Sequence, residues 1–127
     1  MAIKAMIARE CVHFSLTSDI WSSRTSEAYI SLIIHCLTDN FDMKVVILRC
    51  ALLSNVRHAG IEIANILRNS LEDANLCLSD IVVYVTDNAS NATKSATELS
   101  VNQQGCIEHT LHLVVQIFIP RQIERNN

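Results

Sequence analysis

The sequence predicts an α/β fold in which a mixed β-sheet is packed against helices. Three strand-like segments in the first half of the chain are separated by short polar turns, as in an antiparallel meander. A segment with the hydrophobic period of a helix follows. A β-branched apolar run comes next, which is typical of a strand buried on both faces. A helix between two strands of one sheet usually leaves them parallel with a right-handed connection, so we expect both kinds of strand pairing.

The three early strands are predicted from two patterns. Residues 14–21 alternate between apolar and polar side chains, with Asp19 and Trp21 on the more polar side. Residues 28–37 are almost wholly apolar and read as an interior strand, and residues 44–53 form the third strand after a polar turn. Together these segments predict the antiparallel part of the sheet.

The next elements are a helix, a buried strand and a second helix. Apolar residues recur at helical spacing over residues 63–74, which predicts an amphipathic helix of about four turns. Residues 81–86 form the buried strand. A second helix is expected over residues 89–99, capped at its start by the Asp/Asn-rich turn at residues 87–91.

The end of the chain predicts a short strand and a last helix. Residues 104–107 are expected to add a fifth strand, and residues 108–119 a helix that is apolar almost all round and that ends at Pro120. We therefore divide the chain into a helical lead-in at residues 1–13, one α/β core at residues 14–119 and a polar tail at residues 120–127.

The composition limits which cellular environment and which binding partners we expect for this chain. The net charge is −3, and the ten Lys and Arg residues are thinly spread. Proteins that hold DNA through its phosphates usually carry a basic patch, so weak or no DNA binding is expected of this chain alone. The five cysteines are odd in number and scattered, which favours reduced thiols in the nucleus or cytosol. No apolar run reaches the ~20 residues of a membrane helix, and we expect an intracellular protein with no membrane contact.

Asp87 is the first candidate functional residue. It follows the buried strand and opens a polar turn that also contains Asn88 and Asn91. In open α/β sheets, ligands bind outside the carboxyl ends of the strands. Placement alone leaves two interpretations open, a ligand of a metal or phosphate and a turn or helix-capping residue.

Asp19 is the possible partner of Asp87. If residues 81–86 lie beside residues 14–21 in the sheet, the two carboxylates come close together. Paired carboxylates suit Mg²⁺ or Mn²⁺, and a two-metal site would use them for in-line phosphoryl transfer.

Three segments carry a resemblance to a known family. They are residues 14–23 (FSLTSDIWSS), 86–91 (TDNASN) and 106–115 (CIEHTLHLVV). In this order they resemble the hAT transposase superfamily, and in particular the BED-zinc-finger transposase-derived proteins of animals. The resemblance covers residues 14–119.

The resemblance implies an RNase H-like core, DNA as the ancestral substrate, Mg²⁺ or Mn²⁺ as cofactor and a nuclear location. Asp19 matches the first catalytic aspartate of the family and Asp87 the second. Trp21 matches the tryptophan that follows the first aspartate, and Asn88 lies beside the second. Cys106 and His109 match a Cys-x-x-His motif next to the active site.

The sequence also departs from the family pattern. The third acid of the family, a glutamate, follows a helical insertion that this chain does not reach, and the BED finger and the carboxy-terminal dimerisation region are missing. Ala92 stands where methionine is usual, and Glu108 where a small residue is usual. We therefore expect a fragment of a transposase core, ancestrally a metal-dependent DNA-cleaving and strand-transferring enzyme, that is inactive as it stands.

Other interpretations remain. The chain could be a non-catalytic protein-interaction module in the nucleus, and its apolar last helix could drive self-association. Cys106, His109 and His112 have a C-x2-H-x2-H spacing, but structural zinc normally takes four ligands, so packing roles are favoured for them. Nothing in the spacing requires Glu108 to replace the third acid, and Trp21 is interpreted as a packing residue.

Overall fold

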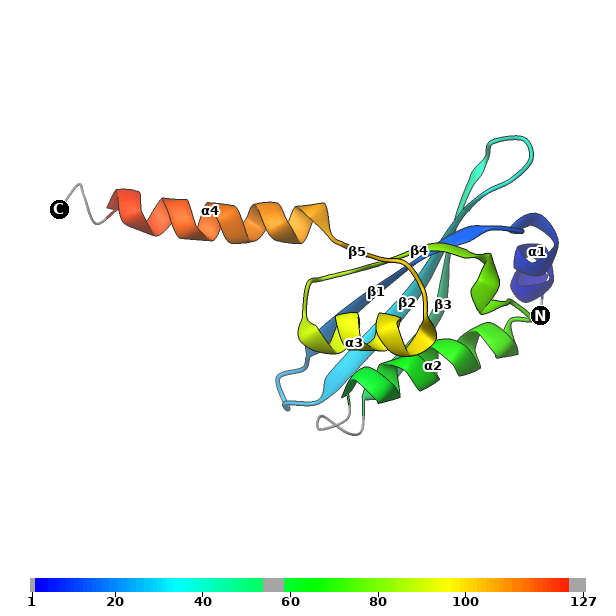
Figure 1. The fold of residues 1–127 in the computed structure, drawn as a ribbon, viewed down its shortest axis with the longest axis horizontal. Helices are drawn as coiled ribbons and strands as arrows, with labels where there is room; N and C mark the ends of the chain where they lie inside the picture. Colours follow the sequence, from blue (N-terminus) through cyan, green and yellow to red (C-terminus); the bar gives the residue numbers. More distant parts are fainter. Residues whose placement is uncertain (1, 54–58, 124–127) are drawn as a thin grey trace.

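The computed structural model describes residues 2–53 and 59–123 (Figure 1). They form five strands, four α-helices and a short 3-10 helix at Leu78–Asp80. In chain order the labelled elements are α1 (Ala2–Glu10), β1 (Phe14–Ser22), β2 (Ala28–Leu37), β3 (Met43–Leu53), α2 (Ala59–Asp73), β4 (Ile81–Thr86), α3 (Ser90–Leu99), β5 (Gln103–Gly105) and α4 (Ile107–Ile123).

The five strands form one mixed sheet in the order β3-β2-β1-β4-β5. The pairs β1–β2 and β2–β3 are antiparallel, whereas β1–β4 and β4–β5 are parallel. The change of direction follows from the connections, since short turns join the first three strands and helices precede β4 and β5. This arrangement confirms the predicted RNase H-like α/β fold.

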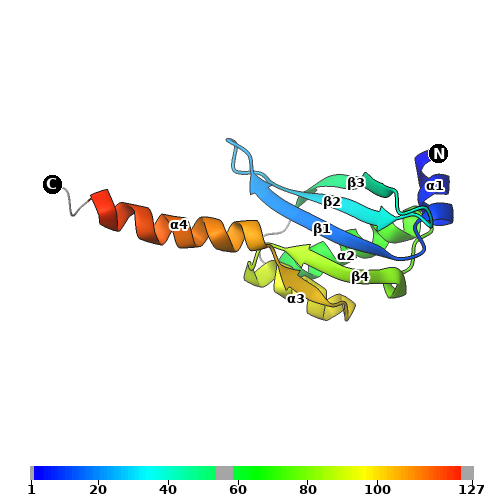
Figure 2. The same cartoon turned by 90° about the horizontal axis from the view of Figure 1, so that it is seen from above.

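One hydrophobic core lies between the sheet and the helices α2 and α3. Alternate residues of the central strands point into it, and the apolar stripes of the two helices cover them. Its largest fully buried apolar members are Ile7, Phe14, Leu16, Ile30, Leu32, Ile34, Ile63, Leu67, Leu71 and Tyr84. Figure 2 shows α2 and α3 on the same side of the sheet. Among the described residues, no helix covers the opposite side, which we call the open face.

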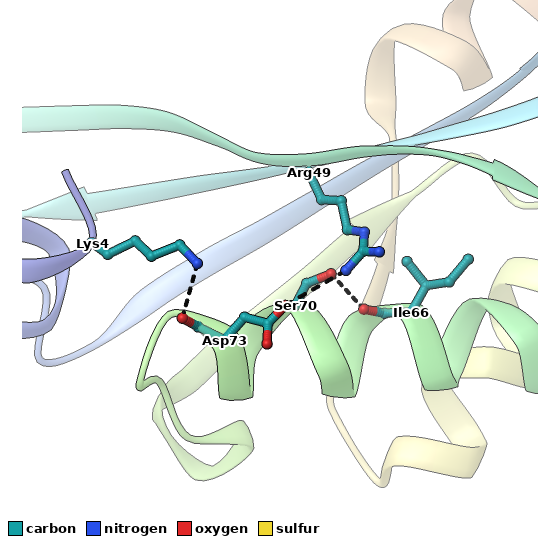
Figure 3. A network of polar contacts seen from close by, with 5 residues as sticks. All are labelled: Lys4, Arg49, Ile66, Ser70 and Asp73. Atoms are coloured by element: carbon teal, nitrogen blue, oxygen red, sulfur yellow. Dashed lines mark hydrogen bonds and ion pairs between the residues drawn. The ribbon is translucent and has the colours of Figure 1, made fainter. Parts of the chain in front are cut away.

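Polar contacts hold α1 and β3 to the end of α2 (Figure 3). The Lys4 ammonium donates a hydrogen bond of 3.0 Å to the Asp73 carbonyl oxygen. The Arg49 guanidinium lies 3.7 Å from the Asp73 carboxylate, and the Ser70 hydroxyl donates to the Ile66 carbonyl within the helix. Both members of the Arg49–Asp73 pair are well exposed, so this ion pair adds little stability. The Lys4 contact is exposed as well, so the buried Ile7 is the stronger anchor of α1.

The prediction of five reduced cysteines is wrong for Cys11 and Cys36, which form a disulfide. Cys11 directly follows α1, and Cys36 pairs with Phe14 in the sheet, so the turn into β1 brings the two residues to a Cα–Cα distance of 5.6 Å. Their separation of 25 residues gave no sign of this contact. Cys50, Cys77 and Cys106 are free.

The last helix also differs from its prediction. It runs to Ile123 and therefore continues through Pro120, where a stop was expected. Proline removes one backbone hydrogen bond of a helix, and a carbonyl group that faces water can bond to solvent instead. None of the helices among the described residues is long and apolar enough to cross a membrane.

Candidate functional site at the ends of β1 and β4

The parallel register of β1 and β4 brings the two candidate aspartates to the same edge of the sheet. Thr17 pairs with Val85, which is the last pair of this ladder. Asp19 follows Thr17 by two residues within β1, and Asp87 follows Val85 by two residues just beyond β4, so both lie at the same end of this strand pair. Asp19 is exposed on β1, and Asp87 is half-buried in the turn after β4.

The turn at Asp87 is fixed by hydrogen bonds from three sides. The Thr86 hydroxyl donates to the Asp87 carbonyl at 2.8 Å and accepts from the Gln103 amide at 2.9 Å. The Cys106 N–H donates to the Thr86 carbonyl at 2.7 Å and so continues the β4–β5 ladder. The Asp87 carboxylate accepts a bond of 3.3 Å from the Ala89 N–H. The backbone that carries Asp87 is therefore well defined.

The prediction that the Asp/Asn cluster caps α3 is wrong in its detail. The N-cap residue is Ala89, which has no side-chain capping bond. The Asp87 carboxylate accepts a hydrogen bond from the N–H of Ala89, which precedes the first turn of α3. The Asn91 side-chain oxygen accepts from the N–H of the adjacent Ala92 at 2.8 Å. Asp87 therefore shapes the turn before α3, Asn91 bonds within the first turn of the helix, and neither is the N-cap residue.

Asn88 packs directly on β5. A Cβ atom added to Gly105 would overlap the Asn88 side chain, whose Nδ2 atom would lie 2.7 Å away. Glycine at position 105 therefore allows the turn that carries Asp87 and Asn88 to approach the end of β5.

Tyr84 is a buried residue of this region that the sequence analysis did not single out. Its hydroxyl lies 2.6 Å from the Ser18 hydroxyl and also bonds to Ser95 of α3. Ser18 precedes Asp19 by one residue, and Tyr84 precedes Asp87 by three. The network thus joins β1, β4 and α3 on the helix-covered side of the sheet. A buried tyrosine usually needs such a partner for its hydroxyl, and this rule was the available signal.

Burial raises the pKa of the Tyr84 hydroxyl. The hydrogen bonds with Ser18 and Ser95 lower the pKa, and the negative charge of Asp87 raises it. Desolvation is the largest of these effects, so Tyr84 stays protonated beyond the usual range of a tyrosine. The influence of Asp87 also indicates that its carboxylate lies near this buried network.

Trp21 lies at the end of β1 and stacks on Tyr29 of β2. Their ring centroids are 5.8 Å apart, with an interplanar angle of 20°. The two residues are cross-strand partners in the β1–β2 ladder, which explains the contact. Trp21 is still 41% exposed, so the stack covers one ring face and leaves part of the indole in water.

Cys106, His109 and Glu108 lie at the start of α4. Cys106 and His109 are half-buried, and Glu108 is exposed. The Cys106 carbonyl accepts bonds from the Thr110 N–H and hydroxyl, both at 3.1 Å. His112 lies one turn further on, with its Nε2 atom 2.8 Å from the Gln116 amide.

These residues do not assemble a metal centre with one another or with the aspartates. Within residues 2–53 and 59–123, no three His, Cys, Asp or Glu side chains converge as metal ligands. The zinc interpretation of Cys106, His109 and His112 therefore has no geometric support there, and Glu108 does not join Asp19 and Asp87.

A separate cavity lies at the other end of β1, and sequence reasoning missed it. Its volume is about 470 Å³, and its lining includes His13, His35, Glu10, Met43 and Val82. The Thr17 hydroxyl lies 3.0 Å from the His35 ring, which fixes this imidazole on the open face. These residues come from four separate segments, so no local motif marks the cavity.

The mixed five-stranded sheet, with Asp19 and Asp87 at the same end of β1 and β4, is typical of one class of protein, the RNase H-like α/β domains. A family model described as the ZBED1 RNase-like domain matches residues 17–112, well over half of the chain. The chain therefore belongs to this family of BED-zinc-finger, transposase-derived RNase H-like domains. Comparison with curated proteins gave no match.

Proposed function

We propose that this chain derives from the catalytic core of a hAT-type DNA transposase, that Asp19 and Asp87 are its inherited metal ligands, and that it does not cleave DNA by itself. The observation that carries the proposal is the β1–β4 register, in which both aspartates stand two residues beyond the last pair. The family match supports the transposase ancestry.

The donor set at this edge suits Mg²⁺ or Mn²⁺. Mg²⁺ keeps several waters and commonly takes one or two carboxylates from a protein. Asp19 and Asp87 would hold the ion, while Asn88 packs the turn against Gly105. In complete enzymes of this chemistry, bound metal ions activate the nucleophile and stabilise the leaving oxygen.

The proposed inactivity follows from the small number of acidic side chains at this end of β1 and β4. Two carboxylates leave a two-metal site short of ligands, and no third acid converges on them within the residues that the structure describes. The net charge of −3 also weakens DNA binding. The chain should therefore bind duplex DNA weakly or not at all in fluorescence anisotropy at physiological salt.

Mn²⁺ titration followed by electron paramagnetic resonance tests the metal ligands. We expect weak binding that falls about tenfold or more in Asp19→Asn and in Asp87→Asn, because each change removes a charged ligand. Asp39→Asn is the matched control, since Asp39 is an exposed acid in the β2–β3 turn. Equal binding by all four proteins, or none by the unmodified chain, would contradict the metal assignment.

A plasmid-nicking assay tests inactivity separately. We expect no nicking above background with Mg²⁺ or Mn²⁺. Nicking that disappears in Asp19→Asn would show that the chain is an active nuclease, and the inactivity proposal would then be wrong.

A second candidate is a non-catalytic protein-interaction module in the nucleus. It is supported by the exposed apolar side chains of the open face and of α4, and the family favours a nuclear location. Absence of Mn²⁺ binding would favour this candidate. Microscopy of the tagged chain tests the location, and exclusion from the nucleus would contradict it.

A further inference from the structure

The open face of the sheet carries apolar side chains that water contacts. Met43, Val45 and Ile47 of β3 and Leu37 of β2 all point to this side, and Ile47 is 69% exposed. The opposite faces of the same strands are covered by α2 and α3. An exposed apolar surface of this kind marks an interaction site, and it requires a partner with an apolar surface of matching length.

The helix α4 offers a surface of this kind. Its large apolar side chains within residues 107–118 are all exposed, including Phe118 at 65%. Glu108 is the single Asp, Glu, Lys or Arg residue in that range. Figures 1 and 2 show α4 extending beyond the end of the sheet. Both apolar surfaces therefore lack a partner in the described part of one chain, and burying them against each other removes almost no charge from water.

The connection to β5 keeps α4 away from its own sheet. Only Cys106 separates Gly105, the end of β5, from Ile107, the start of α4. The Cys106 N–H bonds to Thr86 in the ladder, and its carbonyl accepts from Thr110 in the helix. Because one residue with both groups bonded cannot reverse the chain, α4 would have to unwind its first turn to reach its own open face.

We propose that α4 docks on the open face of a second copy of this chain, and that two copies exchange their α4 helices in a symmetric dimer. Residues 107–118 span about 18 Å of a helix about 10 Å across, so burying one side covers about 280 Å² of the helix. Two helices and two sheet faces then bury about 1,100 Å² in total, slightly above the ≈ 1,000 Å² expected of a specific interface. The exchange also pairs both of these unpartnered apolar surfaces in one step.

Sedimentation velocity on three proteins tests the proposal. The unmodified chain should form a dimer whose population rises with concentration. The helix variant Leu111→Lys/Val115→Lys and the sheet variant Val45→Lys/Ile47→Lys should each raise the dimer dissociation constant by about a hundredfold or more. Ile61→Lys is the matched control because Ile61 is a partly exposed apolar residue on α2, away from both surfaces. It should leave the dimer intact.

Photo-crosslinking identifies the contact without depending on the folding of the variants. Benzoylphenylalanine in place of Leu111 is introduced into an isotopically labelled chain, which is then mixed with unlabelled chain. The proposal predicts crosslinks from labelled α4 peptides to unlabelled β2 and β3 peptides. Three results would overturn it: a monomer at all concentrations, crosslinks confined to chains of one label, or loss of the dimer in the helix variant but not in the sheet variant. The last result would indicate that α4 pairs with α4.

Discussion

The hydroxyl groups of Ser18 and Tyr84 lie 2.6 Å apart on the helix-covered side of β1 and β4, and both residues are close in sequence to the two aspartates of the candidate site. The backbone ladder between β1 and β4 ends at Thr17 and Val85. The hydroxyl bond continues the connection between these strands toward Asp19 and Asp87, and Ser95 ties it to α3. The relative position of the two aspartates therefore depends on a buried polar network as well as on strand pairing.

Tyr84→Phe should destabilise the fold by about 1–2 kcal/mol, because it leaves the Ser18 hydroxyl without its partner in a region of low water access. Ser95 is less affected, since its hydroxyl also donates to the Ala92 carbonyl at 2.7 Å. Urea denaturation measures the loss. Ser18→Ala and the double variant complete a thermodynamic cycle, in which a coupling energy near zero would show that the bond does not stabilise the protein.

The stability of the protein should fall above about pH 10, the unfolded pKa of tyrosine. Burial raises the pKa of Tyr84 in the folded state, so the folded protein retains a proton that the unfolded chain loses. This contribution is complete below pH 10 and is lost as the pH rises through the folded pKa. Urea denaturation at increasing pH measures the decline, which should become smaller in Tyr84→Phe.

Tyr29 provides the control for this pH dependence. The hydrogen bond to Glu27 raises its pKa, and the charge of Glu27 adds to the effect. Tyr29 lies at the surface, where solvent screens such effects. Tyr29→Phe should therefore keep most of the alkaline loss. If the pH dependence of stability changes more in Tyr29→Phe than in Tyr84→Phe, the alkaline loss of stability comes from Tyr29, and the assignment to Tyr84 is wrong.

Much of the fold could be predicted from the sequence because its signals are local. The alternation in β1, the apolar run of β4 and the helical period of α2 each lie within one continuous segment, and each predicted element is present. The expectation that β4 is buried on both faces is wrong, because Val82 is exposed and no helix among the described residues covers the open face. The family match supports the BED-zinc-finger, RNase H-like part of the resemblance. Element ends were less accurate, as at Pro120, since they depend on a few hydrogen bonds.

The candidate site was only partly predictable for a related reason. Asp19 and Asp87 were singled out because Asp19 lies within one recognisable strand pattern and Asp87 directly follows another. Tyr84, the disulfide of Cys11 and Cys36, and the cavity at His35 all depend on contacts between distant segments. No local periodicity reports such contacts, and the count of five cysteines argued against a disulfide.

Gly60→Ala should destabilise the protein by about 1 kcal/mol, even though alanine favours helices. A Cβ atom at position 60 would lie 2.9 Å from the Cβ, Cγ and Cδ atoms of Lys94 on α3. The resulting strain of about 1–3 kcal/mol exceeds the gain in helix propensity of about 1 kcal/mol. Thermal and urea denaturation measure the change.

The exposed position Asn69 of α2 is the control for helix propensity. Asn69→Ala should be neutral or slightly stabilising, because it improves propensity without a close contact. Lys94→Ala should relieve part of the loss in Gly60→Ala by removing Cγ and Cδ. If Gly60→Ala raises the stability as Asn69→Ala does, α2 and α3 do not approach each other as closely as the structure describes.

The disulfide between Cys11 and Cys36 should stabilise the folded protein by about 3.5 kcal/mol, the value expected from chain entropy for its loop. Its partners are 25 residues apart and buried at the junction of α1 with the sheet. The air-oxidised protein, unfolded in urea, should therefore expose three reactive thiols, and all five after reduction.

Reduction should lower the urea midpoint of the unmodified chain but should not lower that of Cys11→Ala/Cys36→Ala. The control is Cys77→Ala, which changes an exposed free cysteine and should behave like the unmodified chain. Five reactive thiols before reduction would mean that the bond does not form, and α1 would then be held by noncovalent contacts such as those of Ile7, Met6 and Lys4.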